Sequence, residues 1–170
     1  TFSYDNWKRS KIEIKYIFSL LHNYLNKNYL ELEKKKISIK FIGEKNRLPL
    51  KIKKLINFYN NKHQKKSKLH INIAFNYSSK RELLNSINLI KKKRLNINEK
   101  NIDKHLYTNF FPNPDLLIRT GGHKRLSDFL LWQMSYTEIF FIKKLWPEFN
   151  SKDLTNIVNN FKVVKRNYGK

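Results

Sequence analysis

Residues 114–122 of this 170-residue chain read Pro114-Asp115-Leu116-Leu117-Ile118-Arg119-Thr120-Gly121-Gly122. The apolar run 116–118 has no polar alternation, which indicates a strand covered on both faces. Two prolines interrupt the chain before this run, and the paired glycines after Arg119 allow the backbone to turn tightly. Fully covered strands are typical of a parallel sheet between layers of helices, so the segment favours an α/β fold.

Patterns on both sides of this segment alternate between helix and strand. Helical spacing of apolar residues predicts helices over 10–28, 49–60, 79–93, 98–107, 127–135 and from 151 onwards. Strand patterns cover 37–41, 69–75, 116–118 and 139–142, and Thr1-Phe2 is interpreted as the tail of another strand. The sequence therefore predicts one α/β domain over residues 1–170, with a mainly parallel central sheet flanked by helices and incomplete at its N-terminal side.

Local signals predict where several helices start and which faces they bury. Capping boxes are expected at Ser10–Glu13 and Ser79–Glu82, Pro49 opens the second helix, and Ser151 caps the last one. The expected buried faces comprise Ile14, Ile17, Leu20, Leu21, Tyr24 and Leu25 in the first helix, and Ile52, Leu55, Ile56 and Tyr59 in the second.

Composition excludes some classes of site and leaves others open. The chain has no Cys, which excludes disulfides, Cys-based zinc sites and a thiol nucleophile. It has 36 Lys and Arg against 13 Asp and Glu, a net charge of +23. Such an excess attracts nucleic acid, acidic membranes and phosphorylated substrates alike. The abundance of Lys, Asn and Ile also fits the codon bias of an AT-rich genome, so the charge alone decides little.

The turn after the strand at 116–118 is a candidate anion site. Ligands of open α/β sheets bind beyond the carboxyl ends of strands, where Arg119 stands. Arg125 and Ser127 follow at the start of the helix expected over 127–135, whose free amides would also attract an anion. Arg binds phosphate oxygens in bidentate fashion, so the group suits a diphosphate. The alternative is an ordinary strand-to-helix turn with exposed arginines.

Longer blocks of sequence carry a resemblance to a known family. They read Phe2-Ser3-Tyr4-Asp5-Asn6-Trp7-Lys8-Arg9, Ile42-Gly43-Glu44 with Arg47, Asn72-Ile73-Ala74 with Asn76-Tyr77, residues 115–122, residues 125–133, Tyr136-Thr137-Glu138 and Leu145-Trp146-Pro147-Glu148-Phe149. In this order and over nearly the whole chain, they resemble cis-prenyltransferases of the undecaprenyl diphosphate synthase type.

The resemblance implies a Mg²⁺-dependent prenyltransferase that condenses isopentenyl diphosphate onto an allylic diphosphate such as farnesyl diphosphate. The product would be a long-chain polyprenyl diphosphate, such as undecaprenyl diphosphate, which carries cell-wall glycans. Arg119, Arg125 and Ser127 would bind the diphosphate of isopentenyl diphosphate, and Glu138 would help to bind Mg²⁺. The remaining site residues implied are Asn6 and Arg9 as catalytic residues and Trp7 for substrate positioning.

The resemblance also implies partners and a location. A cytoplasmic homodimer that contacts the membrane to release product is expected. The tail Arg166-Asn167-Tyr168-Gly169 resembles a family segment that reaches a neighbouring subunit; its alternative is a frayed basic end. The apolar faces of the helices expected over 10–28 and 49–60 are candidate walls of a hydrocarbon tunnel, with plain core packing as the equal alternative.

Several departures from the family pattern bear on activity. The family's opening Asp-Gly-Asn-Gly-Arg motif, whose Asp is the principal Mg²⁺ and diphosphate residue, does not occur in this sequence. We therefore expect these 170 residues alone to be inactive or very weakly active. His123 stands where Glu is usual, Ser78-Ser79 replaces Gly-Gly, and Lys80 replaces Arg. The rival interpretations are a non-catalytic or decayed prenyltransferase subunit and, more distantly, a basic nucleic-acid-binding protein; no specific nucleic-acid partner is expected.

Overall fold

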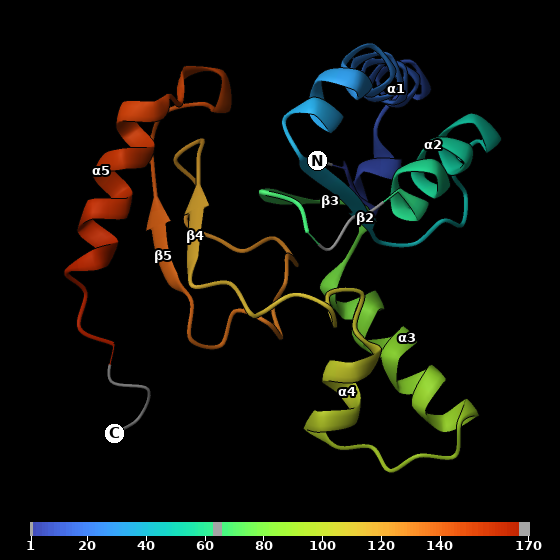
Figure 1. Cartoon of the computed structure of the whole chain (residues 1–170). Coiled ribbons are helices and arrows are strands. Elements are labelled where there is room, and N and C mark those ends of the chain that lie inside the picture. Colours follow the sequence, from blue (N-terminus) through green and yellow to red (C-terminus); the bar gives the residue numbers. More distant parts are fainter. Residues whose placement is uncertain (1, 63–65, 167–170) are drawn as a thin grey trace. The chain divides into compact units, whose positions relative to one another are not determined.

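A computed structural model describes residues 2–62 and 66–166 of the chain. Contacts divide the chain into two compact units, residues 1–108 and residues 109–170. All described strand pairs are parallel, and helices alternate with strands from β1 to α3, whereas β4 and β5 follow each other without a helix between them (Figure 1). The α/β class and its parallel strand pairing are therefore confirmed. The single domain expected over 1–170 stays a prediction.

The first unit holds a three-stranded parallel sheet in the order β1-β3-β2. Its elements are β1 (Phe2–Ser3), the 3-10 helix η1 (Tyr4–Lys8), α1 (Lys11–Lys34), β2 (Ile37–Ile42), α2 (Leu50–Asn61), β3 (Leu69–Tyr77), α3 (Ser79–Lys92) and α4 (Glu99–His105). The pair β2–β3 runs in register from Ile37 opposite Leu69 to Ile42 opposite Ala74. Both α1 and α2 pack against β2 (Figure 1).

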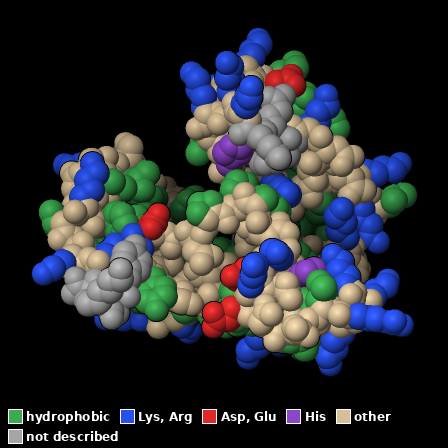
Figure 2. Space-filling model, turned by 60° about the horizontal axis from the view of Figure 1, so that its bottom comes forward, with side chains coloured by type: hydrophobic (Ala, Val, Ile, Leu, Met, Phe, Trp, Pro, Cys, Tyr) green, Lys and Arg blue, Asp and Glu red, His purple; other side chains and the backbone are tan. Residues whose placement is uncertain are grey.

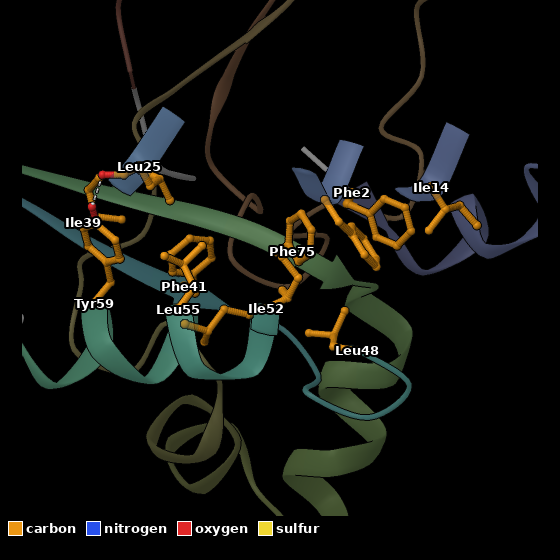
Figure 3. Close-up of a cluster of buried hydrophobic side chains, with 12 residues drawn as sticks. Phe2, Ile14, Leu25, Ile39, Phe41, Leu48, Ile52, Leu55, Tyr59 and Phe75 are labelled. Carbon is orange, nitrogen blue, oxygen red and sulfur yellow. Dashed lines mark hydrogen bonds between the residues drawn. The ribbon is translucent and has the colours of Figure 1, made fainter. Parts of the chain in front are cut away.

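The core of the first unit lies between this sheet and the two helices. Figure 3 shows buried side chains of this core, among them Phe2 and Phe75. The ring of Phe18 packs against both. The Phe2 ring centroid lies 5.2 Å from that of Phe18 and 5.3 Å from that of Phe75. The hydroxyl of Tyr59 on α2 donates a 2.8 Å hydrogen bond to the carbonyl of Leu25 on α1. This bond satisfies a buried polar group and joins the two helices.

The helix faces confirm one prediction and correct another. All four residues predicted for α2 are buried: Ile52, Leu55, Ile56 and Tyr59. In α1, however, Leu20 and Tyr24 are exposed, and the buried residues are Ile14, Phe18 and Leu25. Helix α1 has 24 residues, and only one narrow side of so long a helix meets the core. The strand β2 is buried on both faces rather than alternating, because α1 and α2 both cover it.

Helix starts differ from expectation by single residues. The side chain of Ser10 accepts the amide of Glu13, as predicted, but the Glu13 carboxylate pairs with Arg9 instead of returning to the cap. At α3 the capping side chain is Ser78, which accepts the amide of Arg81, whereas Ser79 is buried in the first turn.

The second unit consists of β4 (Leu116–Arg119), β5 (Glu138–Phe141), the 3-10 helix η2 (Trp146–Glu148) and α5 (Ser151–Lys162). The strands pair in parallel, with Leu116 opposite Glu138 and Arg119 opposite Phe141. Every residue of β4 is only half-buried, so the expected coverage of both faces is not seen in this unit. The cap of α5 is Asn150, one residue before the predicted Ser151; its side chain accepts two backbone amides.

The helix expected over 127–135 does not form. This segment consists of turns, and Ser127, Asp128 and Leu130 have left-handed backbone angles with φ of 51°, 58° and 47°. Three left-handed residues so close together cannot continue a right-handed helix.

The surface carries the charge that the composition predicts. Figure 2 shows Lys and Arg side chains spread over many parts of the visible face, with only a few Asp and Glu among them. Among the described residues, none of the helices is both long and apolar enough to cross a bilayer.

Candidate functional site

The carboxyl end of β4 brings together the three residues predicted to bind a diphosphate. Arg119 is the last residue of the strand, and its Nη1 donates to the Ser127 hydroxyl at 3.1 Å and to the backbone carbonyl of Arg125. Both bonds use the same nitrogen. The other guanidinium N–H groups make no hydrogen bond within residues 2–62 and 66–166, so they remain available to an anion.

The paired glycines serve a different purpose from the one expected. Gly121 and Gly122 have φ of 88° and 74°, which other residues rarely adopt. Their amides, however, donate to the carbonyls of Lys144 and Ile142, each at 2.8 Å. The glycines therefore tie the turn to the chain that follows β5 and do not offer these amides to a ligand. Because the expected helix over 127–135 is absent, no helix N-terminus is present there to attract an anion.

A cavity of about 290 Å³ lies beside this turn. Its lining residues are Leu117, Ile118, Arg119, Thr120, Arg125, Leu126, Ser127 and Phe129. The Arg125 and Ser127 side chains are exposed and Arg119 is half-buried. The arrangement is an open, positively charged pocket with an apolar floor, which suits a small molecule with an anionic head.

Glu138 lies away from this group. It begins β5 opposite Leu116, and its amide donates to the carbonyl of Asp115 at 3.0 Å. Since β4 and β5 are parallel, Glu138 occupies the amino edge of the pair, whereas Arg119 occupies the carboxyl edge. Three residues of strand separate the two edges, roughly 10 Å. The structure therefore does not bring Glu138 together with Arg119, Arg125 and Ser127.

The described residues do not by themselves form a magnesium site. Across residues 2–62 and 66–166, no three His, Cys, Asp or Glu side chains gather closely enough to hold a metal ion. One carboxylate alone, Glu138, is a poor Mg²⁺ site, because the ion needs near-octahedral oxygen ligands.

The residues predicted near the N-terminus lie in and around η1. The side-chain oxygen of Asn6 accepts the amide of Ser3 at 2.8 Å, so Asn6 shapes the turn. Trp7 donates from its indole nitrogen to the Asn76 side chain at 2.7 Å. Arg9 pairs with Glu13 on α1. The three predicted residues thus belong to one turn, although their side chains have separate partners.

Two further residues join this turn, and their roles were not predicted. The Arg47 guanidinium lies 5.0 Å from the centre of the Trp7 ring. Asn76 is the last residue but one of β3, has a left-handed φ of 52° and accepts a hydrogen bond from the Trp7 indole. Both residues occur in the blocks that carry the family resemblance. Arg47 lies in the loop after β2, and Asn76 lies at the carboxyl end of β3. This position at the carboxyl ends of neighbouring parallel strands was the signal that could have assigned both residues to a site.

A larger cavity of about 660 Å³ adjoins the same turn. Its apolar lining comes from Trp7, Ile14, Phe18, Pro49 and Ile52. Its cationic lining comes from Arg9, Lys11, Lys15, Arg47 and Lys51. Ser19 and His22 on α1 are the remaining lining residues of this cavity. Residues of α1 and α2 both line this space, and Ile14, Phe18 and Ile52 among them also belong to the buried core, so the tunnel-wall and core-packing interpretations both stand. The cavity combines apolar walls with cationic side chains, which matches an amphiphile that has an anionic head.

Arg166, the first residue of the tail predicted to reach a neighbouring subunit, is bound within its own unit. It donates to the Asp115 carboxylate at 2.7 Å and to the Tyr136 carbonyl at 3.1 Å, and it lies over the Phe161 ring. Residues 167–170 of that tail lie outside the described residues.

Comparisons with known proteins agree on one family. Residues 1–169 match the family model described as "Putative undecaprenyl diphosphate synthase". An isoprenyl transferase of Rickettsia bellii is 40% identical over 171 residues, covering 100% of this chain and 76% of that protein. An isoprenyl transferase of Fusobacterium nucleatum is 37% identical over 169 residues, covering 99% of this chain and 73% of that protein.

Two solved structures share the fold. A "probable undecaprenyl diphosphate synthase" of Campylobacter jejuni has a TM-score of 0.91 and 35% identity, covering 99% of this chain and 80% of that one. Lavandulyl diphosphate synthase of Lavandula x intermedia, solved with dimethylallyl diphosphate, has a TM-score of 0.91 and 29% identity, covering 99% and 76%. With the family match and these identities, the chain belongs to the cis-prenyltransferase family of undecaprenyl diphosphate synthases.

Proposed function

We propose that this chain condenses isopentenyl diphosphate onto an allylic diphosphate, farnesyl diphosphate, to build a long-chain polyprenyl diphosphate. Undecaprenyl diphosphate, the lipid carrier for cell-wall glycans, is the product proposed. The observation that carries the proposal is the convergence of Arg119, Ser127 and the Arg125 segment at the carboxyl end of β4. Family membership supports the reaction class.

The Arg119 turn supports the proposed isopentenyl diphosphate site by its chemistry. The unused N–H groups of Arg119 form a planar fork that matches two phosphate oxygens, and the Ser127 hydroxyl can donate as well. Charge-assisted hydrogen bonds of this kind contribute about 1.5–3 kcal/mol each. Arg125 is exposed at the cavity and adds a second cation. The apolar residues of the cavity, Leu117, Ile118, Leu126 and Phe129, would then pack against the short hydrocarbon of this substrate.

The cavity of the first unit supports the proposed allylic site. Each buried CH₂ group of a prenyl chain gains about 0.8 kcal/mol, so an apolar cavity favours a long hydrocarbon strongly. The cationic residues Arg9 and Arg47 line the same cavity and suit a diphosphate head. Trp7 lines this cavity with the Arg47 guanidinium over its ring, and it would position the substrate. The relative solved with dimethylallyl diphosphate makes an allylic ligand chemically reasonable here.

The remaining parts of the proposal come from the family alone. They are Mg²⁺ dependence with Glu138 as a ligand, a homodimer, a cytoplasmic location and peripheral contact with the membrane on product release. Asn6 and Arg9 are proposed as catalytic residues; Asn6 shapes the turn through Ser3, and Arg9 lines the cavity.

Calorimetric titration with isopentenyl diphosphate and, separately, farnesyl diphosphate tests the proposal. We expect both ligands to bind in the micromolar to millimolar range typical of enzyme substrates. Incorporation of labelled isopentenyl diphosphate with Mg²⁺ is measured alongside and is expected to be absent or very weak for these 170 residues alone. Failure of both diphosphates to bind would refute the proposed function.

Two further outcomes separate the rival interpretations. Binding of both diphosphates supports the substrate sites, and any Mg²⁺-dependent incorporation above background, however weak, would contradict the non-catalytic interpretation. Sequence-selective binding of duplex DNA that survives physiological salt, without diphosphate binding, would favour the nucleic-acid alternative, because non-specific attraction weakens steeply with salt.

A further inference from the structure

Two arginines from different elements lie over the ring of Tyr4 in η1. The Arg81 guanidinium on α3 is 4.1 Å from the ring centroid, and the Arg47 guanidinium after β2 is 5.7 Å from it. Arg47 also donates from Nη1 to the Tyr4 hydroxyl at 3.3 Å. Cations over an aromatic face are attracted to its electron-rich centre, and Arg in addition stacks its plane on the ring. Tyr4 is therefore held by residues that are far away in the sequence.

Glu44 fixes the nearer of the two arginines. Its carboxylate accepts two hydrogen bonds from Arg81, from Nε at 2.7 Å and from Nη2 at 2.8 Å. The same carboxylate accepts a 2.6 Å bond from the side-chain amide of Asn46. Only 16% of the Glu44 side chain is exposed to solvent, so this ion pair is partly shielded from water. Hydrogen bonding to Glu44 raises the pKa of Arg81 above its ordinary value.

The network continues from Tyr4 to the cavity. Arg47 lies over Tyr4 and Trp7 at once, and both Arg47 and Trp7 line the larger cavity. Asn76 accepts the Trp7 indole and returns its own amide to the Glu44 carbonyl at 2.8 Å. A closed path of contacts thus runs from Arg81 through Tyr4 and Arg47 to Trp7, and back to Glu44.

We propose that Tyr4, Glu44 and Arg81 are positioning residues that hold Trp7 and Arg47 in place at the cavity of the first unit. None of these three residues lines the cavity. They would act on a ligand indirectly, by holding Trp7 and Arg47, which do line it. The Nε and Nη2 groups of Arg81 already donate to the Glu44 carboxylate, and Arg81 does not line this cavity. Of the two arginines at the Tyr4 ring, Arg47 is the one that lines the cavity. The part of this inference that concerns a ligand rests on the proposed function.

The experiment follows the indole N–H of Trp7 by NMR hydrogen exchange in isotope-labelled protein, with its signal assigned by loss in Trp7→Phe. Arg81→Lys keeps the charge but loses the bidentate fork and the flat face, and Tyr4→Leu removes the ring. We expect each change to speed indole exchange about tenfold, since a cation–π contact and its ion pair are lost. Tyr4→Phe keeps the ring and is expected to stay within about twofold of wild type.

Lys91→Gln, an exposed change on the same helix as Arg81, is the matched control and should not alter indole exchange. The melting temperature of each variant is measured, so that local loosening is separated from general unfolding. Unchanged indole exchange in both Arg81→Lys and Tyr4→Leu would overturn the positioning role. Faster indole exchange in Lys91→Gln too would also overturn the positioning role, because substitutions away from the Tyr4 contacts would then have the same effect.

Farnesyl diphosphate affinity is measured on the same variants to separate this inference from the proposed function. We expect Arg81→Lys and Tyr4→Leu to weaken binding severalfold, and Tyr4→Phe to bind as wild type does. If wild type binds no farnesyl diphosphate while the indole still responds, the proposed function fails and the positioning of Trp7 stands. If farnesyl diphosphate binds equally to wild type and to variants with fast indole exchange, the positioning role toward the ligand is refuted.

Discussion

The two candidate binding regions are built in opposite ways. In the first unit, the site beside η1 rests on side chains: Trp7 is held by Asn76 and Arg47, and the core beneath it is closely packed. In the second unit, the site after β4 rests on backbone: the glycines at 121 and 122 turn the chain, and Arg119 reaches a carbonyl and a hydroxyl. Buried aromatic rings support the first region, whereas the second is half-exposed throughout.

The difference suggests how each region tolerates change. A site held by packed side chains is disturbed wherever the packing is disturbed, because protein interiors leave little free volume. A site held by an open turn depends mainly on the few donors that point at the ligand. Stability should therefore be sensitive to substitutions around β2 and β3, and ligand affinity should be sensitive to substitutions in the Arg119 turn.

The largest expected effect comes from one matched pair of glycine substitutions. Gly43 follows β2 with φ of 125°, and a Cβ there would lie 2.2 Å from the backbone carbonyl oxygen of Phe75. The backbone of β3 would have to move, so Gly43→Ala should lower the free energy of unfolding by about 3 kcal/mol or more. Chemical denaturation measures this value.

Gly121→Ala is the counterpart in the second unit. Its φ of 88° strains any other residue, but no atom lies within 4 Å of the added Cβ. Only backbone strain remains, so we expect Gly121→Ala to lower the free energy of unfolding by about 1 kcal/mol. Equal losses in the two variants would contradict the contrast between a packed region and an open one.

A smaller effect is expected from filling the cavity of the first unit. Ser19 lines it from α1, so Ser19→Trp places a large ring in the space proposed for the prenyl chain. We expect farnesyl diphosphate to bind about tenfold more weakly, since two or more CH₂ groups lose their apolar surroundings. Isopentenyl diphosphate affinity should not change.

Lys27→Trp adds the same ring to an exposed position of α1 that does not line the cavity. Its affinity for farnesyl diphosphate should stay within about twofold of wild type. Equal weakening by both Trp variants would show that the hydrocarbon does not occupy this cavity.

The smallest effect concerns Tyr107, beside the Glu44–Arg81 pair. Burial, followed by the charges of Glu44 and Glu82, raises its pKa to about 12 from 10.0. Between these two values the folded chain keeps a proton that the unfolded chain releases, so stability falls as pH rises through this window. Tyrosinate absorbance should show a component near pH 12 that Tyr107→Phe lacks. An identical titration curve in that variant would contradict the assignment.

Much of the fold was predictable because its signals are local. The buried face of α2 was predicted in full, since Ile52, Leu55, Ile56 and Tyr59 follow one helical stripe and meet a single surface. Parallel pairing followed from the alternation of helices and strands. The cap of α3 was placed one residue late because two adjacent serines offer the same hydroxyl, and only packing decides that Ser79 is buried.

Other features depend on contacts that no local pattern carries. The segment 127–135 has apolar residues that suit a helix, yet Ser127, Asp128 and Leu130 adopt left-handed angles. For the site, the sequence predicted Arg119, Arg125 and Ser127 as a group, because they lie within nine residues of each other. The contacts of Trp7 with Arg47 and Asn76 join residues 40 or more positions apart, and only the folded chain brings them together.

The central claim is that the turn after β4 binds the diphosphate of isopentenyl diphosphate through Arg119. Equilibrium binding of this ligand to wild type, Arg119→Gln and Lys124→Gln tests it most directly. Lys124 is exposed in the same turn and makes no described contact with the Arg119 group, so it controls for the loss of one positive charge. The account predicts at least about tenfold weaker binding for Arg119→Gln and little change for Lys124→Gln. Equal affinity of Arg119→Gln and wild type would contradict it.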